Sequence, residues 1–226
     1  MDPLNVVKIT AAIVSVIIAF TAGFIELRLN PDYWLNRWFT IFFISTSLGF
    51  LTYTIYHLIL DFSQIIIPIM ILAQIFFNLV PISAVMTVFI LEKYKKIAMD
   101  FRHLGIMMGL FIIMSIGYFI WIPQLNMVSY NQGIVNTVTP IGWFLFVNII
   151  RLILDIFVVY RYAVILRKIE GETKKRIIWF FIGILVAIIG VFFNLIGGFL
   201  DFIYLEIVAL ILLDVGMIII VKGFFI

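Results

Sequence analysis

Charged and amide side chains interrupt two otherwise apolar stretches of the sequence. Arg151 and Asp155 lie four residues apart in one of them, shortly after Asn148. On a helix, Arg151 would lie about 60° and Asp155 about 20° from Asn148, so the three residues would share one face. Neighbours at this spacing can pair directly. An ion pair that only fixes helix packing is the simpler interpretation of the same pattern.

The second apolar stretch contributes Glu206 and Asp214. By depth, Asp214 lies level with Arg151 and Asp155, so we expect an intramembrane charge cluster of one cation and two carboxylates. Two carboxylates at close range cannot both stay ionised. One of them would then be a candidate proton carrier or pH-sensitive switch. Depth alone supports this convergence, because the sequence does not reveal which helices are neighbours.

A second polar group lies toward the other end of the same stretches. Its members are candidate ligand-binding residues that could line a cavity opening outward: His57, Gln74, Asn78, Asn148, Asn194 and Glu206. Hydrogen bonds between helices are the alternative role for such side chains, at an average of about 0.6 kcal/mol per contact.

Several chemistries lack the residues that they need. The sequence has no cysteine, which excludes disulfides, Fe–S clusters and thiol nucleophiles. A retinal protein needs a lysine near the middle of the last stretch, where Asp214 and Gly216 stand instead. His57 and His103, on opposite sides, are too few for a zinc hydrolase. We therefore expect no enzyme, catalytic residue, metal or cofactor, and no nucleic-acid partner.

The composition indicates whether this chain lies in water or in a membrane. Of its 226 residues, 65% are hydrophobic and only 12% are charged, and the mean hydropathy is +1.25. A soluble domain carries about 25% charged residues, so this chain could not cover itself with a polar surface. We expect a multi-pass protein of the cell membrane, with the lipid bilayer as its main partner.

Seven stretches are long and apolar enough to cross a bilayer as helices, which takes about 20 residues. They are 6–25, 38–60, 65–91, 105–122, 140–163, 177–199 and 203–221. Turn-forming or polar residues separate them, such as Asn30-Pro31-Asp32. The sequence therefore predicts an all-α fold, a bundle of seven transmembrane helices that forms a single domain over residues 1–226.

Lys and Arg are distributed very unevenly between the two sides of this arrangement. Thirteen of the 15 fall on one side, whereas Lys8 alone falls on the other and Arg151 lies inside a span. The thirteen are Arg28, Arg37, Lys93, Lys95, Lys96, Arg102, Arg161, Arg167, Lys168, Lys174, Lys175, Arg176 and Lys222. Because cytoplasmic loops are rich in Lys and Arg, we expect the N-terminus outside the cell and the C-terminus in the cytoplasm.

Two features bear on helix packing. Pro81 falls in the middle of the third span, where it removes a backbone hydrogen bond and favours a kink. Gly105 and Gly109 have the small-xxx-small spacing that permits close approach of helices. That spacing indicates either a dimer face or an internal contact, and we expect the internal contact.

Two segments carry a resemblance to a known family. They are Leu35-Asn36-Arg37-Trp38-Phe39, which opens the second span, and the run Asp61 to Pro81, which leads into a long third helix. With seven spans, the chain resembles the membrane sensor domain at the N-terminus of many bacterial and archaeal histidine kinases and cyclases. The resemblance implies an input module that passes a helix movement to a cytoplasmic output domain. No such domain precedes Ile226, so we expect a piece of a longer protein or a separate partner.

These observations lead to a hypothesis and two alternatives. The hypothesis is a prokaryotic, receptor-like sensor in signal transduction, which binds a small or lipophilic ligand in an outward-facing pocket. It would signal to a cytoplasmic partner or act as a homodimer. One alternative is a small transporter or proton-coupled channel that uses the Arg151, Asp155 and Asp214 group. The other is a purely structural membrane subunit.

Overall fold

The computed structural model describes residues 3–59, 62–93, 101–200 and 202–223, and seven of its helices are long and apolar enough to cross a membrane. These helices are α1 (Pro3–Leu29), α2 (Trp34–Leu58), α3 (Ser63–Lys93), α5 (Phe101–Ile120), α7 (Ile141–Leu166), α8 (Gly171–Leu200) and α9 (Ile203–Lys222). All seven predicted spans are confirmed as helices. Several are longer than their apolar stretch, because a helix can continue where the sequence becomes polar.

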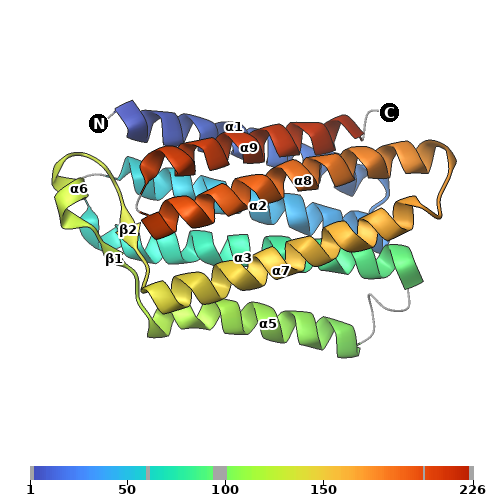
Figure 1. Ribbon diagram of the computed structural model, residues 1–226, viewed down its shortest axis with the longest axis horizontal. Coiled ribbons are helices and arrows are strands. Elements are labelled where there is room, and N and C mark those ends of the chain that lie inside the picture. The colour runs from blue at the N-terminus through green and yellow to red at the C-terminus, as the bar shows by residue number, and fades with distance from the viewer. Residues whose placement is uncertain (1–2, 60–61, 94–100, 201, 224–226) are drawn as a thin grey trace.

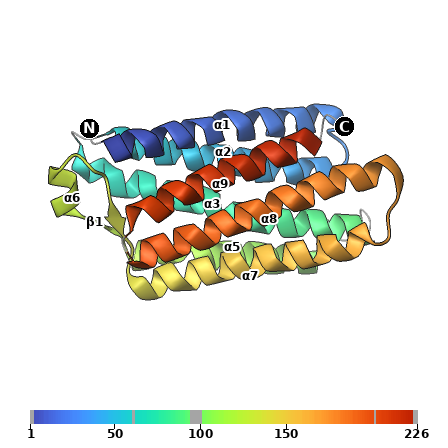
Figure 2. The same cartoon turned by 45° about the horizontal axis from the view of Figure 1, so that its top comes forward.

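The helices lie side by side along one long axis, with the two chain ends at opposite ends of the bundle (Figure 1). We call the end where α1 begins the N-terminal face and the opposite end the C-terminal face. α9, the last helix, packs against α1, the first, as well as against α8 (Figure 2). α7 packs against α3 and α8, and α5 lies at the edge of the bundle against α3.

The connection between α5 and α7 has structure that the sequence did not predict. Strand β1 (Gln124–Leu125) pairs antiparallel with β2 (Thr137–Val138), and the short helix α6 (Met127–Asn131) lies between them. Asn126 caps α6, since its Oδ1 accepts from Val128 N at 3.1 Å and Ser129 N at 3.3 Å. This hairpin projects from the N-terminal face (Figure 1).

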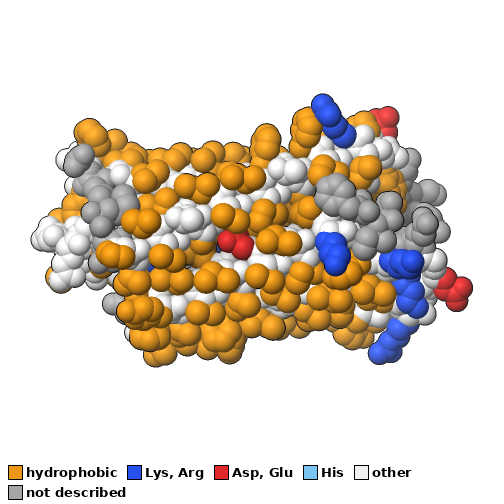
Figure 3. All heavy atoms as spheres, turned by 90° about the horizontal axis from the view of Figure 1, so that it is seen from above, with side chains coloured by type: hydrophobic (Ala, Val, Ile, Leu, Met, Phe, Trp, Pro, Cys, Tyr) orange, Lys and Arg blue, Asp and Glu red, His pale blue; other side chains and the backbone are white. Residues whose placement is uncertain are grey.

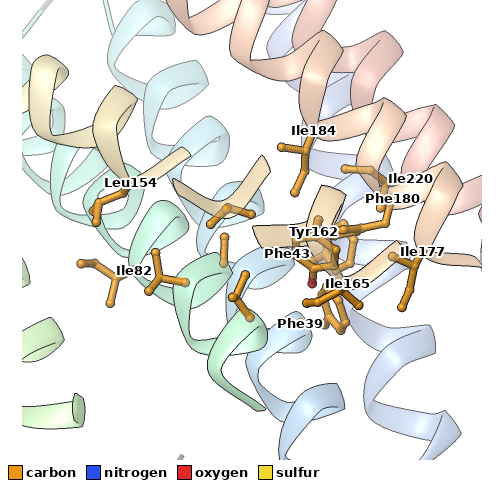
Figure 4. Close-up of a cluster of buried hydrophobic side chains, with 14 of the residues drawn as sticks. Phe39, Phe43, Ile82, Leu154, Tyr162, Ile165, Ile177, Phe180, Ile184 and Ile220 are labelled. Carbon is orange, nitrogen blue, oxygen red and sulfur yellow. The ribbon is translucent and has the colours of Figure 1, made fainter. Parts of the chain in front are cut away.

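The C-terminal half of the bundle is closed by one large apolar cluster, which we call the aromatic plug (Figure 4). The rings of Phe39 and Phe180 meet edge to face with centroids 4.8 Å apart, and Tyr162 packs on Phe180 at 4.9 Å. Aliphatic side chains from five helices surround these rings, among them Ile82, Leu154, Ile165, Ile184 and Ile220. This packing leaves the N-terminal half as the place where polar groups can gather.

The outer surface matches a bilayer environment. An apolar band covers the side of the bundle seen in Figure 3, and Lys and Arg gather there toward the C-terminal face. Aromatic rings hold some of these cations, as Lys222 Nζ lies 4.3 Å from the centroid of the Trp179 ring. The apolar band is the surface that lipid would cover.

Glycines allow the backbones of α8 and α9 to approach each other closely. A Cβ on Gly183 would lie 2.5 Å from the Gly216 carbonyl oxygen, and one on Gly190 would lie 2.9 Å from the Ala209 oxygen. We call this seam the α8–α9 contact. By contrast, a Cβ on Gly105 or Gly109 would meet none of the described residues within 4 Å. The expectation of an internal contact at those two glycines is wrong, because α5 turns that side away from its neighbours.

This difference between the glycines gives a stability prediction. Gly183→Val should lower the melting temperature of the purified chain strongly, because the new side chain overlaps backbone that cannot move aside; overpacking costs about 1–3 kcal/mol. Gly109→Val is the matched control and should leave the melting temperature within a few degrees of the parent. The packing of α5 described above would be contradicted if the two variants were equally destabilised.

Candidate functional site

A single cavity of about 560 Å³ brings together most of the predicted ligand-binding residues. Five of the six line it: His57, Gln74, Asn148, Asn194 and Glu206. Arg151 and Asp155 line the same cavity. The sixth residue, Asn78, lies behind Arg151 and holds it in place. Whether the cavity takes a ligand remains a prediction.

The cavity has a closed inner end and an open side. Two of its lining residues, Pro81 and Asp155, are adjacent in sequence to Ile82 and Leu154 of the aromatic plug. Residues 135–140, which contain β2 and precede α7, line the opposite end at the N-terminal face. Asn194 and Gly198 are exposed as well as cavity-lining, so the cavity opens beside this part of α8.

Arg151 is held by neutral oxygen atoms from α3. Its Nε donates to Asn78 Oδ1 at 3.0 Å, and its Nη2 donates to Asn78 Oδ1 at 2.6 Å, Gln74 Oε1 at 3.0 Å and Gln74 O at 3.2 Å. These bonds to Gln74 and Asn78 hold the guanidinium plane against α3. A charged donor makes stronger hydrogen bonds than a neutral one, so this contact ties α7 to α3 within the membrane.

The amide side chains that hold Arg151 are themselves held by α5. Asn78 Nδ2 donates to Met114 O at 3.0 Å and to Ser115 Oγ at 3.3 Å, and the Tyr118 hydroxyl donates to Gln74 Oε1 at 3.3 Å. Asn78 is fully buried, so its position depends on these partners. The result is one network across α3, α5 and α7 that fixes the guanidinium at the cavity wall.

The predicted pair between Arg151 and Asp155 does not form as an ion pair. Within the described residues, no salt bridge or hydrogen bond joins the two side chains, although they interact electrostatically. The reason is that Gln74 and Asn78 occupy the guanidinium from the side of α3. The Asp155 carboxylate therefore faces the cavity and accepts no hydrogen bond from the part of the chain that the structure describes.

Asp214 does not join Arg151 and Asp155, so the predicted three-residue charge cluster is wrong. Its Oδ1 accepts a short hydrogen bond from the Ser15 hydroxyl, and both residues are buried between α9 and α1. The reason is the arrangement of the helices, since α9 packs on α8 and α1, whereas α7 packs on α3 and α8. Asp214 is absent from the residues that line the cavity.

Lys8 is a cavity residue that the sequence indicated only as the one Lys or Arg on its side of the membrane. It is 3% exposed and forms an ion pair with Glu206, which joins α1 to α9 beside the cavity. One signal could have identified it, since Lys8 is the only lysine at that end and Glu206 is the acid at matching depth. A buried cation needs such a partner.

His57 closes the same corner of the cavity from α2. Its Nδ1 lies 2.9 Å from the Tyr53 carbonyl, which can only accept, so Nδ1 carries the proton. Its own carbonyl accepts from Asn5 Nδ2 at 3.3 Å. Tyr53 and Tyr56 pack on the imidazole with centroids 4.0 and 4.3 Å away. These contacts join α2 to α1 where Lys8 meets Glu206.

The chain was compared with protein-family models, with curated proteins and with solved structures, and none of them matches it. Among the described residues, no three His, Asp or Glu side chains are grouped so that they could hold a metal ion.

The Lys8–Glu206 pair gives a second prediction. Lys8→Met should lower the free energy of unfolding by about 3 kcal/mol, because it leaves a carboxylate unpaired inside the bundle. The double variant Lys8→Met with Glu206→Met should recover most of that loss. A double-mutant cycle by denaturant unfolding in micelles measures the coupling. Additive effects of the two substitutions would mean that the pair contributes nothing.

Proposed function

We propose that this chain is a receptor-like sensor domain, which binds a small molecule in the cavity and passes a helix movement to the opposite face of the membrane. One observation carries the proposal: polar residues from α1, α2, α3, α5, α7, α8 and α9 surround a single cavity that the aromatic plug separates from the C-terminal face. A pocket of this size suits a small ligand, since ligand sites are usually about 300–1,000 Å³.

The membrane orientation is part of the proposal. Lys and Arg are concentrated at the C-terminal face, which supports a cytoplasmic C-terminus under the positive-inside rule. The cavity would then open toward the outside of a prokaryotic cell membrane. A ligand from the surroundings could reach it beside Asn194 without crossing the bilayer.

The helices that line the cavity also reach the other face. α8 and α9 are locked by the α8–α9 contact and would move as one unit, while α7 is anchored to α3 through Arg151. A ligand between these two bodies would change the angle between α7 and α8 and displace the loop 167–170 at the C-terminal face. A cytoplasmic signalling partner, such as a kinase or cyclase output domain, would read this displacement. The resemblance noted above to input modules supports that choice.

Because the natural sequence has no cysteine, single cysteines can test the orientation and the opening. In intact cells, a membrane-impermeant maleimide should label Val128→Cys rapidly and Asn194→Cys more slowly. Lys168→Cys should react only after the membrane is permeabilised, since it would face the cytoplasm. Rapid labelling of Lys168→Cys in intact cells would reverse the proposed orientation.

A second experiment tests binding and signalling together. A metabolite fraction that raises the melting temperature of the parent chain should not do so for Asn194→Trp, because the indole fills the cavity. Phe192→Trp is the matched control on the outer side of α8 and should respond like the parent. The same fraction should change the distance between spin labels at Leu29→Cys and Lys168→Cys. A shift in melting temperature that survives Asn194→Trp would place binding elsewhere.

The transporter alternative makes an opposite prediction for the same protein. Charged groups inside the membrane, Arg151 and Asp155, are the observation that favours it. For a sensor, liposomes that contain the chain should lose a pH gradient or a trapped metabolite no faster than empty liposomes. Flux that is abolished by Asp155→Asn would favour transport over sensing.

A further inference from the structure

We infer that the ligand of the cavity is a zwitterion, a molecule with one ammonium group and one acid group on an apolar body, as in an α-amino acid. This inference rests on the proposed function, because it names the class of ligand that the pocket would take. Its basis is that Arg151 and Asp155 face the same cavity with opposite charges and do not pair with each other.

Arg151 has one side open toward a ligand. Its Nε and Nη2 donate to Asn78 and Gln74, and Tyr118 interacts with the guanidinium as well. Because a guanidinium has five N–H donors, Arg151 keeps donors for a ligand in the cavity that it lines. Because the network across α3, α5 and α7 fixes the guanidinium, an acid group meets a preorganised donor. A carboxylate is the anion that suits this planar group best in a small molecule.

Asp155 supplies the negative charge that would bind the ammonium group of the ligand. Its carboxylate lines the inner end of the cavity and accepts no hydrogen bond within the described ranges. A carboxylate enclosed in a bundle is stable as an ion only with a cation or several donors beside it. An ammonium group offers three donors on one charged centre and would satisfy Asp155 directly.

The spacing and the total charge agree with a single ligand that carries both groups. Side chains at positions i and i+4 of a helix have Cβ atoms about 5–6 Å apart, which a molecule with both charges on one carbon can bridge. Lys8 and Glu206 neutralise each other in the same cavity. The fixed charges therefore sum to zero, and only a ligand of zero net charge preserves that balance away from water.

The rest of the cavity defines the body of the ligand. Apolar side chains cover its walls beyond the two charges, among them Phe50, Phe77, Phe144, Leu210 and Leu213. At about 560 Å³ the cavity is larger than a charged head group requires. An aliphatic or aromatic substituent on the zwitterion would fill this space.

Two sets of compounds with matched skeletons test the inference on the purified full chain in nanodiscs. One set is L-leucine, isocaproate and isopentylamine, and the other is L-phenylalanine, hydrocinnamate and phenethylamine. In each set the second compound lacks the ammonium group and the third lacks the acid group. In at least one set, calorimetry should give the amino acid at least tenfold higher affinity than either singly charged compound.

Variants of Asp155 and Arg151 then test which side chain binds which charged group of the ligand. Asp155→Asn should lower the affinity for the amino acid at least tenfold and leave that for the carboxylate compound unchanged; it should fold, since Asp155 holds no other residue. Arg151→Gln should do the reverse, and if it does not fold, Asp155→Asn still decides the question. Asp214→Asn, an intramembrane aspartate outside the cavity, is the matched control and should bind like the parent.

The outcomes separate this inference from the proposed function. Equal affinity for an amino acid and a singly charged compound, or an unchanged affinity in Asp155→Asn, would overturn the zwitterion. If a singly charged compound binds as tightly as the amino acid and Asn194→Trp abolishes that binding, the zwitterion is overturned but the proposed sensor pocket is supported. If neither set binds, the zwitterion class is rejected, and the metabolite-fraction experiment decides the proposed function independently.

Discussion

The bundle depends on how it accommodates charge inside hydrocarbon, where an ionisable side chain costs at least about 2.5–3.5 kcal/mol. Arg151 meets this cost through hydrogen bonds to the amide oxygens of Gln74 and Asn78, not through a carboxylate. The consequence extends beyond one residue, because Asn78 is bonded in turn to α5. Three helices are thereby linked, and Asp155 is left facing the cavity. Two further pairs with buried charges, Lys8 with Glu206 and Asp214 with Ser15, lie at the contact between α1 and α9.

The distribution of side-chain types divides the bundle into two halves with different mechanical roles. Aromatic and aliphatic residues fill the C-terminal half as the aromatic plug, while polar residues and the cavity occupy the N-terminal half. Glycines at the α8–α9 contact allow backbone to touch backbone, so that pair resists bending. The network around Arg151 does the same for α3, α5 and α7. Two stiff bodies therefore meet along α7 and α8, and the cavity lies between them.

Depth along the membrane normal could be predicted from the sequence, but the arrangement of helices around the bundle could not. Position along an apolar stretch placed His57, Gln74, Asn148, Asn194 and Glu206 at depths that one cavity now joins. The same reasoning placed Asp214 level with Arg151 and still failed, because depth says nothing about which helices are neighbours. Ser15, the partner of Asp214, is an ordinary hydroxyl with no pattern that marks it. Lys8 could have been identified, since a lone lysine at that end requires an acid nearby.

A path for solute through the bundle would need far more rearrangement than a signal does. Solute that leaves the cavity toward the C-terminal face would have to separate the rings of Phe39 and Tyr162 from Phe180, which both of them contact. A change of angle between α7 and α8 can keep the contact of Tyr162 on Phe180 as its pivot, so that beside the cavity only the contact of Phe144 with Gly198 has to adjust. α1 and α9 are held by two polar pairs and are the less mobile side. Movement on ligand binding is therefore expected between α7 and α8, where a small displacement at the cavity reaches the loop at the C-terminal face.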